Sequence, residues 1–196
     1  MANGLKKHGI TAETLKNLMF SAGTYYKNLK YLEGAWSGTV LGATSGGGGV
    51  NIEPEYMDAE LDGANVALKG GKFKVGEVGK MKVNMTEFTE NAISTALHLE
   101  KETTNTVEGY TVYKTKAQLE DEDYLENVAF VGNLVDGRQA IVIMENALCT
   151  SALELEAKKK EQATYELEFA CHADLEELSN IDTLPIYVYF PVTASV

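Results

Sequence analysis

Acidic residues stand at calcium-binding intervals in the first half of the chain. Asp58, Glu60 and Asp62, followed by Gly63, match the opening of an EF-hand loop, in which alternate acidic residues supply oxygen ligands. That loop also needs a bidentate glutamate at its last position, and Lys69 stands there. The pattern therefore predicts no calcium site of this kind.

The other chemistry-bearing residues do not combine into a catalytic motif. Gly71 and Lys72 precede Phe73, whereas a phosphate-binding P-loop needs Ser or Thr after its lysine. Cys171 and His172 are neighbours on a predicted strand, so they point to opposite faces and do not share a metal. The chain has no Gly-x-Ser-x-Gly nucleophile motif. We predict that the protein is not an enzyme and needs no cofactor or metal.

Length and charge narrow the class of protein. A chain of 196 residues fits a single domain, 1–196, with a sizeable core. The net charge of -12 disfavours a basic nucleic-acid-binding surface. There is no apolar run of membrane-spanning length, no apolar segment typical of a secretory signal, and no cysteine pattern of a disulfide framework. We expect no membrane partner and synthesis in a reducing cytoplasm.

One predicted hairpin is the strongest fold signal. Segments 125–135 and 138–145 are joined by Asp136-Gly137, which favours a two-residue type I′ turn. That register places Phe130 opposite Ile143. Both faces of the hairpin are apolar, so we expect it to lie between layers, as in a β-sandwich or barrel.

Helical and basic segments complete the fold prediction. Thr11 is expected to begin a short helix in the N-terminal arm, about residues 1–20. Thr86 is expected to cap a longer helix that ends near residues 100–102. The strand before it, 72–86, carries lysines on one face. The predicted fold class is mainly β, a sandwich or barrel, with one flanking α-helix and an extended loop.

A second hairpin is predicted from segments 151–157 and 164–171. One of its faces is acidic and carries Glu154, Glu156, Glu166 and Glu168. Glutamates opposite one another destabilise a strand pair. Two interpretations stay open: a solvated face with Lys158 to Lys160 softening the repulsion, or an acidic surface that faces phosphate without binding it.

The segment 42–71 is expected to be a flexible, extended loop. It contains four consecutive glycines, Gly46 to Gly49, and then an acidic stretch. Pro54 limits any strand here to an edge or an end. Such an insertion holds little core and is suited to reaching outside its own domain.

The order of motifs in this segment resembles the major tail (tail tube) proteins of bacteriophages with long, non-contractile tails. The similar positions are Leu41-Gly42-Ala43-Thr44, Gly46-Gly47, Asp62-Gly63-Ala64 and Lys69-Gly70. The resemblance implies a structural virion protein whose hexameric rings stack into a tube for DNA ejection. It implies assembly in the host cytoplasm, a place in the virion tail, and tail tip, tape-measure and terminator proteins as partners.

The same resemblance assigns roles to two sets of residues. In that family an extended loop and the terminal arms bridge subunits and rings. The corresponding positions here are Gly46, Gly47, Gly48, Gly49, Asn51, Glu53, Glu55 and Tyr56. The acidic residues Glu154, Glu156, Glu166 and Glu168 are the candidates for the tube lumen, because a negative lining lets DNA slide past. The lysine face, Lys72 to Lys82, is expected to meet acidic surfaces of a neighbour.

Two other functions remain open. The ring protein of a contractile injection or secretion system shares the tube architecture, and the sequence does not separate the two. A small-ligand-binding β-barrel enzyme is the alternative from another class. It would require a deep pocket with convergent polar groups in the monomer.

Overall fold

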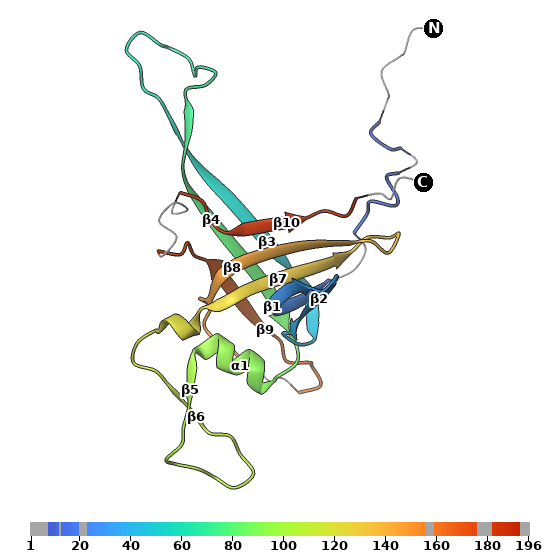
Figure 1. Cartoon of the computed structure of the whole chain (residues 1–196), viewed down its shortest axis with the longest axis vertical. Coiled ribbons are helices and arrows are strands. Elements are labelled where there is room, and N and C mark those ends of the chain that lie inside the picture. The colour runs from blue at the N-terminus through green and yellow to red at the C-terminus, as the bar shows by residue number, and fades with distance from the viewer. Residues whose placement is uncertain (1–7, 12, 20–22, 156–158, 176–181, 193–196) are drawn as a thin grey trace.

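The protein is described here from a computed structural model, which describes residues 8–11, 13–19, 23–155, 159–175 and 182–192. Antiparallel strands dominate, with one α-helix (Figure 1). The elements are β1 (Thr24–Leu32), β2 (Ala35–Val40), β3 (Thr44–Asp58), β4 (Lys72–Met85), α1 (Glu90–Leu97), β5 (Leu99–Lys101), β6 (Tyr113–Thr115), a short 3-10 helix η1 (Asp121–Asp123), β7 (Leu125–Asn133), β8 (Gln139–Cys149), β9 (Tyr165–Cys171) and β10 (Ile186–Tyr189). The prediction of a mainly β fold with one helix is confirmed.

Most strands belong to one antiparallel sheet with the order β2-β1-β7-β8-β9-β4-β3. Strand β10 pairs with β8 beside β9, and β5 and β6 form a separate two-stranded sheet. Strands β3 and β4 form a long hairpin that extends well beyond the other strands of the sheet (Figure 1). The sheet therefore has a packed body and a projecting ribbon.

The β7–β8 hairpin separates two apolar clusters. The larger cluster joins β4 and β9 to one face of this hairpin and includes Met81, Phe169, Val128 and Met144. The smaller cluster lies on the other face and consists of buried Leu29, Ala129, Val131, Ile141 and Ile143, with Tyr26 and Trp36 packed against it. The expectation that both faces of the hairpin are covered is confirmed.

The predicted register of this hairpin is wrong by one residue. Phe130 pairs with Val142 rather than with Ile143. The Leu134 amide donates to the Arg138 carbonyl, and Gly137 has φ 87°. The loop therefore has three residues with glycine in the left-handed conformation, not the two residues of a type I′ turn.

Helix α1 begins later and ends earlier than its sequence predicts. Thr89, not Thr86, is the N-cap, and its hydroxyl accepts a hydrogen bond from the Ala92 amide at 3.1 Å. His98 ends the helix in the left-handed conformation, and β5 follows directly. The expected N-terminal helix is absent from the described residues, where Glu13 to Asn17 form only a hydrogen-bonded turn.

The second predicted hairpin is also wrong. Residues 151–155 are not a strand, and β9 pairs with β4 and with the end of β8 instead. Glu166 lies opposite Asn84, and Glu168 lies opposite Lys82. The predicted repulsion is avoided because each glutamate of β9 has a lysine of β4 within reach.

Candidate functional site

The projecting hairpin, called the arm below, consists of the ends of β3 and β4 beyond Ile52 and Gly79 together with the loop 59–71. The segment from 46 to 56, expected to be part of a flexible loop, lies in strand β3 instead. This difference covers all the predicted inter-subunit residues: Gly46, Gly47, Gly48, Gly49, Asn51, Glu53, Glu55 and Tyr56. The interpretation of a mobile glycine run is corrected to an ordered strand that supports a projecting ribbon.

Two glycines explain how a strand passes through this run. Gly46 and Gly47 have φ values of 80° and 78°, which favour glycine, and the pairing register shifts between Thr44 and Gly48. A Cβ on Gly48 would lie 2.3 Å from both the Lys82 carbonyl oxygen and the Tyr25 hydroxyl. The glycines thus form a bulge and let Tyr25 of β1 reach β3.

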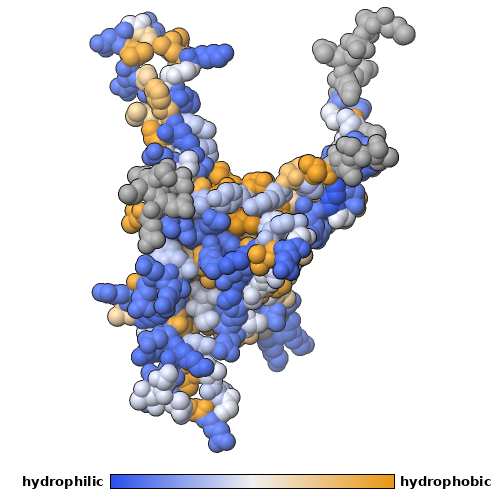
Figure 2. All heavy atoms as spheres, in the orientation of Figure 1, coloured by the Kyte–Doolittle hydropathy of each residue, from blue (hydrophilic) through white to orange (hydrophobic). Residues whose placement is uncertain are grey.

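Large apolar side chains are exposed along the arm, among charged ones (Figure 2). They are Ile52, Tyr56, Met57, Leu61, Val66, Leu68, Phe73 and Val75. Val66 is 75% exposed, although large apolar side chains usually gather in a core. A two-stranded ribbon has no second layer of its own, so these side chains are available to another molecule.

Residues on the outer edge of the arm disfavour the pairing of another β-strand with β3. Strand β3 is the last strand of the sheet, as Pro54 predicted. Pro54 pairs with Glu77 but has no amide hydrogen to offer to an added strand. Glu53 and Glu55 place carboxylates on either side of it. Proline and charges on an edge strand oppose uncontrolled pairing.

At the base of the arm, lysines of β4 and glutamates of β9 form a ladder of ion pairs. Lys80 contacts Glu168 at 2.7 Å, and Lys82 contacts Glu166 at 3.1 Å and Glu168 at 3.0 Å. The hydrogen bonds from Lys80 and Lys82 hold the pKa of Glu168 below its usual range. The same contacts raise the pKa of Lys82. The lysine face predicted to meet a neighbour is therefore paired within the chain at this point.

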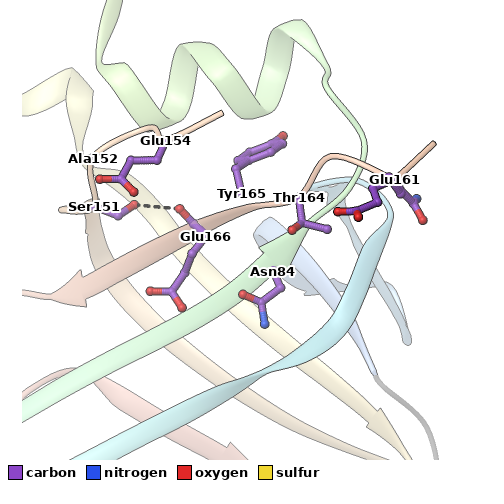
Figure 3. Close-up of a pocket in the computed structure, with 9 residues that line it drawn as sticks. Asn84, Ser151, Ala152, Glu154, Glu161, Thr164, Tyr165 and Glu166 are labelled. Atoms are coloured by element: carbon purple, nitrogen blue, oxygen red, sulfur yellow. Dashed lines mark hydrogen bonds between the residues drawn. The ribbon is translucent and has the colours of Figure 1, made fainter. Parts of the chain in front are cut away.

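A polar hollow of about 520 Å³ lies next to this ladder (Figure 3). Its lining includes Glu154, Glu161, Glu166, Asn84 and Ser151. The Ser151 hydroxyl donates to the Glu166 carbonyl at 3.4 Å and accepts from the Glu168 amide at 3.0 Å. These bonds hold the loop after β8 against β9, so the hollow is built from an ordered strand and its neighbour.

The structure brings together some of the predicted lumen residues. Glu154 and Glu166 line the same hollow. Glu168 lies two residues after Glu166 on β9 and belongs to the ion-pair ladder. Glu156 falls outside the described residues. Sequence reasoning missed Glu161, since its segment was assigned to a turn, and it missed the pairing with β4, because 80 or so residues separate the two strands.

Cys171 and His172 have the surroundings of structural residues. Burial raises the pKa of the Cys171 thiol to about 12, which leaves almost no thiolate at neutral pH. The His172 ring packs edge-on against Tyr124 and bonds the Asn146 carbonyl oxygen at 3.3 Å. Among the described residues, no group of three or more His, Cys, Asp or Glu side chains is placed to hold a metal ion.

Unlike the arm, part of the N-terminal segment is hydrogen-bonded to the body of the molecule. Asn17 accepts a hydrogen bond from Arg138 at 2.7 Å, and the Leu18 carbonyl accepts one from the Val135 amide, so this part of the N-terminal segment lies against the β7–β8 turn.

Within the described ranges, no helix has the length and apolar character that crossing a membrane requires. No protein-family model matches the sequence, and no curated protein matches it.

Proposed function

We propose that the protein is a structural subunit that assembles with copies of itself, as the major tail tube protein of a bacteriophage with a long, non-contractile tail. The observation that carries the proposal is the arm: an ordered two-stranded ribbon with exposed Tyr56, Phe73 and Val75 and no layer to cover them. Such a ribbon is marginal in water unless it packs against something. The motif resemblance in 41–70 supplies the identity of the assembly.

In this proposal the subunits form hexameric rings, and the arm of one ring contacts the next ring. The arm and the β5–β6 hairpin lie at opposite ends of the long axis of the molecule (Figure 1), as stacking along one axis requires. The stack is the conduit for DNA, with tail tip, tape-measure and terminator proteins at its ends and inside it. The subunit acts in the virion tail after assembly in the host cytoplasm.

We infer that the lumen is lined by the face that carries Glu154, Glu161, Glu166 and Glu168. Lys80 and Lys82 neutralise part of this face, but the glutamates outnumber them. An acidic wall repels phosphate and avoids the counterion-releasing contacts that would hold DNA in place. Lysine at both Glu154 and Glu161 is expected to slow DNA ejection from assembled particles, and unchanged ejection would overturn the lumen assignment.

Negative-stain electron microscopy of the purified protein tests the assembly proposal. Wild-type protein is expected to form rings or tubes with a central channel on concentration. In the test variant, residues 54–77 are replaced by Asn-Gly, which closes a hairpin on the paired Glu53 and Val78. This variant is expected to stay folded and to form no tubes.

A matched control shortens the other hairpin. Replacing 103–111 by Asn-Gly closes the hydrogen-bonded Glu102 and Val112 in the same way. In both variants, circular dichroism and urea unfolding report whether the body is intact. Wild-type protein that remains monomeric at every concentration, or an armless variant that forms tubes as readily as wild type, would overturn the proposal.

A further inference from the structure

The β1–β2 hairpin bends over the smaller apolar cluster. The pairing register of β1 with β2 shifts between Lys27 and Lys30, and Asn28 has φ 54°. Beyond this bulge the hairpin leaves the plane of the sheet, because Trp36 of β2 contacts Tyr189 of β10, a strand that pairs with β8 on the side away from β7. The end of the hairpin therefore forms a roof over the outer face of β7 and β8.

A cavity of about 330 Å³ lies beneath this roof. Its lining comprises Tyr26, Leu29, Trp36, Ser37, Gly38, Val131, Gln139 and Ile141. Tyr26, Leu29, Trp36, Val131 and Ile141 give the cavity an aromatic and aliphatic side, whereas polar atoms form the larger share of its exposed wall. The cavity therefore offers a flat apolar surface to a ring and polar atoms to hydrogen-bonding groups on that ring, at the small end of the usual size range of ligand sites.

In the roof, the Trp36 ring is tilted against Tyr31 and lies edge-to-face with Tyr189. The Trp36 ring lies 5.1 Å from Tyr31 at 59° and 5.1 Å from Tyr189 at 77°. These contacts are between partly exposed side chains at the surface, and Tyr31 is 58% exposed. A roof held by such contacts separates from its neighbours at lower cost than a strand within the sheet.

Strand β1 is anchored at Leu29 and bends at the preceding residue, Asn28. The buried Asn127 amide bonds both backbone groups of Leu29, accepting from its N–H at 2.8 Å and donating to its C=O at 3.1 Å. The adjacent Asn28 has a side-chain oxygen that is buried without a hydrogen-bond partner among the described residues. An unpaired buried oxygen destabilises the closed position of this residue. The bend at Asn28 is therefore less well stabilised than the adjacent Leu29, which Asn127 anchors.

We propose that this cavity binds a small planar ring that carries one or two hydrogen-bonding groups, as a phenol does. The ring would lie between Trp36 and the floor formed by Val131 and Ile141. Gln139 donates through its amide nitrogen to Asn133 at 3.0 Å, so its side-chain oxygen is available to accept from a ring hydroxyl. This binding activity is independent of the assembly proposed above.

Phenol itself is the probe, and Trp36 is the reporter. The chain has a single tryptophan, so 5-fluorotryptophan incorporated in the full-length protein gives one fluorine resonance from the roof of the cavity. Titration with phenol is expected to shift that resonance saturably, with half-saturation near or below about 1 mM. A shift that stays linear up to about 10 mM would overturn the proposal.

Two variants place the binding in the cavity. Val131→Phe fills the cavity from its floor, and Ser37→Leu fills it from an exposed position that does not threaten folding. Each is expected to weaken phenol binding at least about tenfold. Phe73→Ala, on the arm, is the control and is expected to bind as wild type does. Equal binding by wild type and Ser37→Leu would place the ring elsewhere and overturn the proposal.

Discussion

The two ends of strand β4 carry the same alternation of side chains and have opposite surroundings. Met81, Val83 and Met85 are 0% exposed, whereas Phe73 and Val75 are 52% and 56% exposed. Strand β9 pairs with β4 from Lys80 to Met85, and beyond that point β3 is the only strand that pairs with β4 among the residues that the structure describes. Alternation thus determines which side chains share a face, while burial depends on a second layer that only part of the strand has.

The comparison predicts opposite results for two phenylalanine deletions. Phe169→Ala in the body removes a fully buried ring and is expected to lower the free energy of unfolding by about 3 to 5 kcal/mol. Phe73→Ala on the arm is expected to change it by less than about 0.5 kcal/mol. Urea denaturation of the monomers measures both. Similar losses for the two variants would show that the arm is covered in the monomer.

The buried polar contact of the body gives the next largest effect. Asn127→Leu leaves the N–H and C=O of Leu29 without partners and is expected to destabilise the protein by about 2 kcal/mol. Asn105→Leu in the exposed β5–β6 loop is the control, with an expected change within about 0.5 kcal/mol. Equal urea midpoints for the two variants would mean that the paired amide contributes little.

Adjacent glycines at the root of the arm sharpen the comparison further. Gly48→Ala brings a Cβ to 2.3 Å from Lys82 and Tyr25, so we expect a loss of about 1 to 3 kcal/mol. Gly49 has no atom within 4 Å of the same position, and Gly49→Ala is expected to be neutral or slightly stabilising. The difference between the two thermal midpoints is the measurement, and a difference of zero would contradict the close approach of β1 to β3.

The ion-pair ladder gives the smallest effect, and it depends on pH. Because Lys80 and Lys82 lower the pKa of Glu168 from 4.5, this carboxylate stabilises the folded state above that value. The contribution is lost as the pH falls through the lowered pKa. Glu168→Gln is expected to reduce the acid-induced loss of stability by up to about 1 kcal/mol, measured by urea unfolding at about pH 7 and pH 3. Glu108→Gln, in an exposed loop, is the control and should follow wild type.

Local patterns predicted the elements that depend on neighbours in sequence. The β7–β8 hairpin was predicted from Asp136-Gly137 between two apolar segments, and the strand 72–86 from its period of two. The register failed by one residue because the loop closes through Arg138 rather than directly across Asp136-Gly137. A dipeptide of this kind favours a turn but does not determine the number of residues in the loop.

Contacts between distant segments were beyond the reach of local patterns. The sequence correctly placed Glu166 and Glu168 on one face of β9, but it predicted the wrong partner strand. The actual partner, β4, lies far back in the sequence. The glycine run was predicted to be flexible, because neither the bulge at Gly46 nor the contact of Tyr25 with Gly48 has a local signal in the sequence. The cavity under Trp36 depends on the bend at Asn28 and on the contact with Tyr189 of β10, and no local pattern indicates either of them.

Pro54 has a consequence for how copies of this chain recognise one another. Two arms that met edge to edge could not form an unbroken ladder, since each lacks a donor at the middle of its outer strand. The glutamates on either side would also bring like charges together. Arm-to-arm pairing is thereby disfavoured over contact of an arm with a different surface. Growth by such unlike contacts has a direction, and the proline therefore acts against disordered aggregation while it leaves polar, end-to-end polymerisation open.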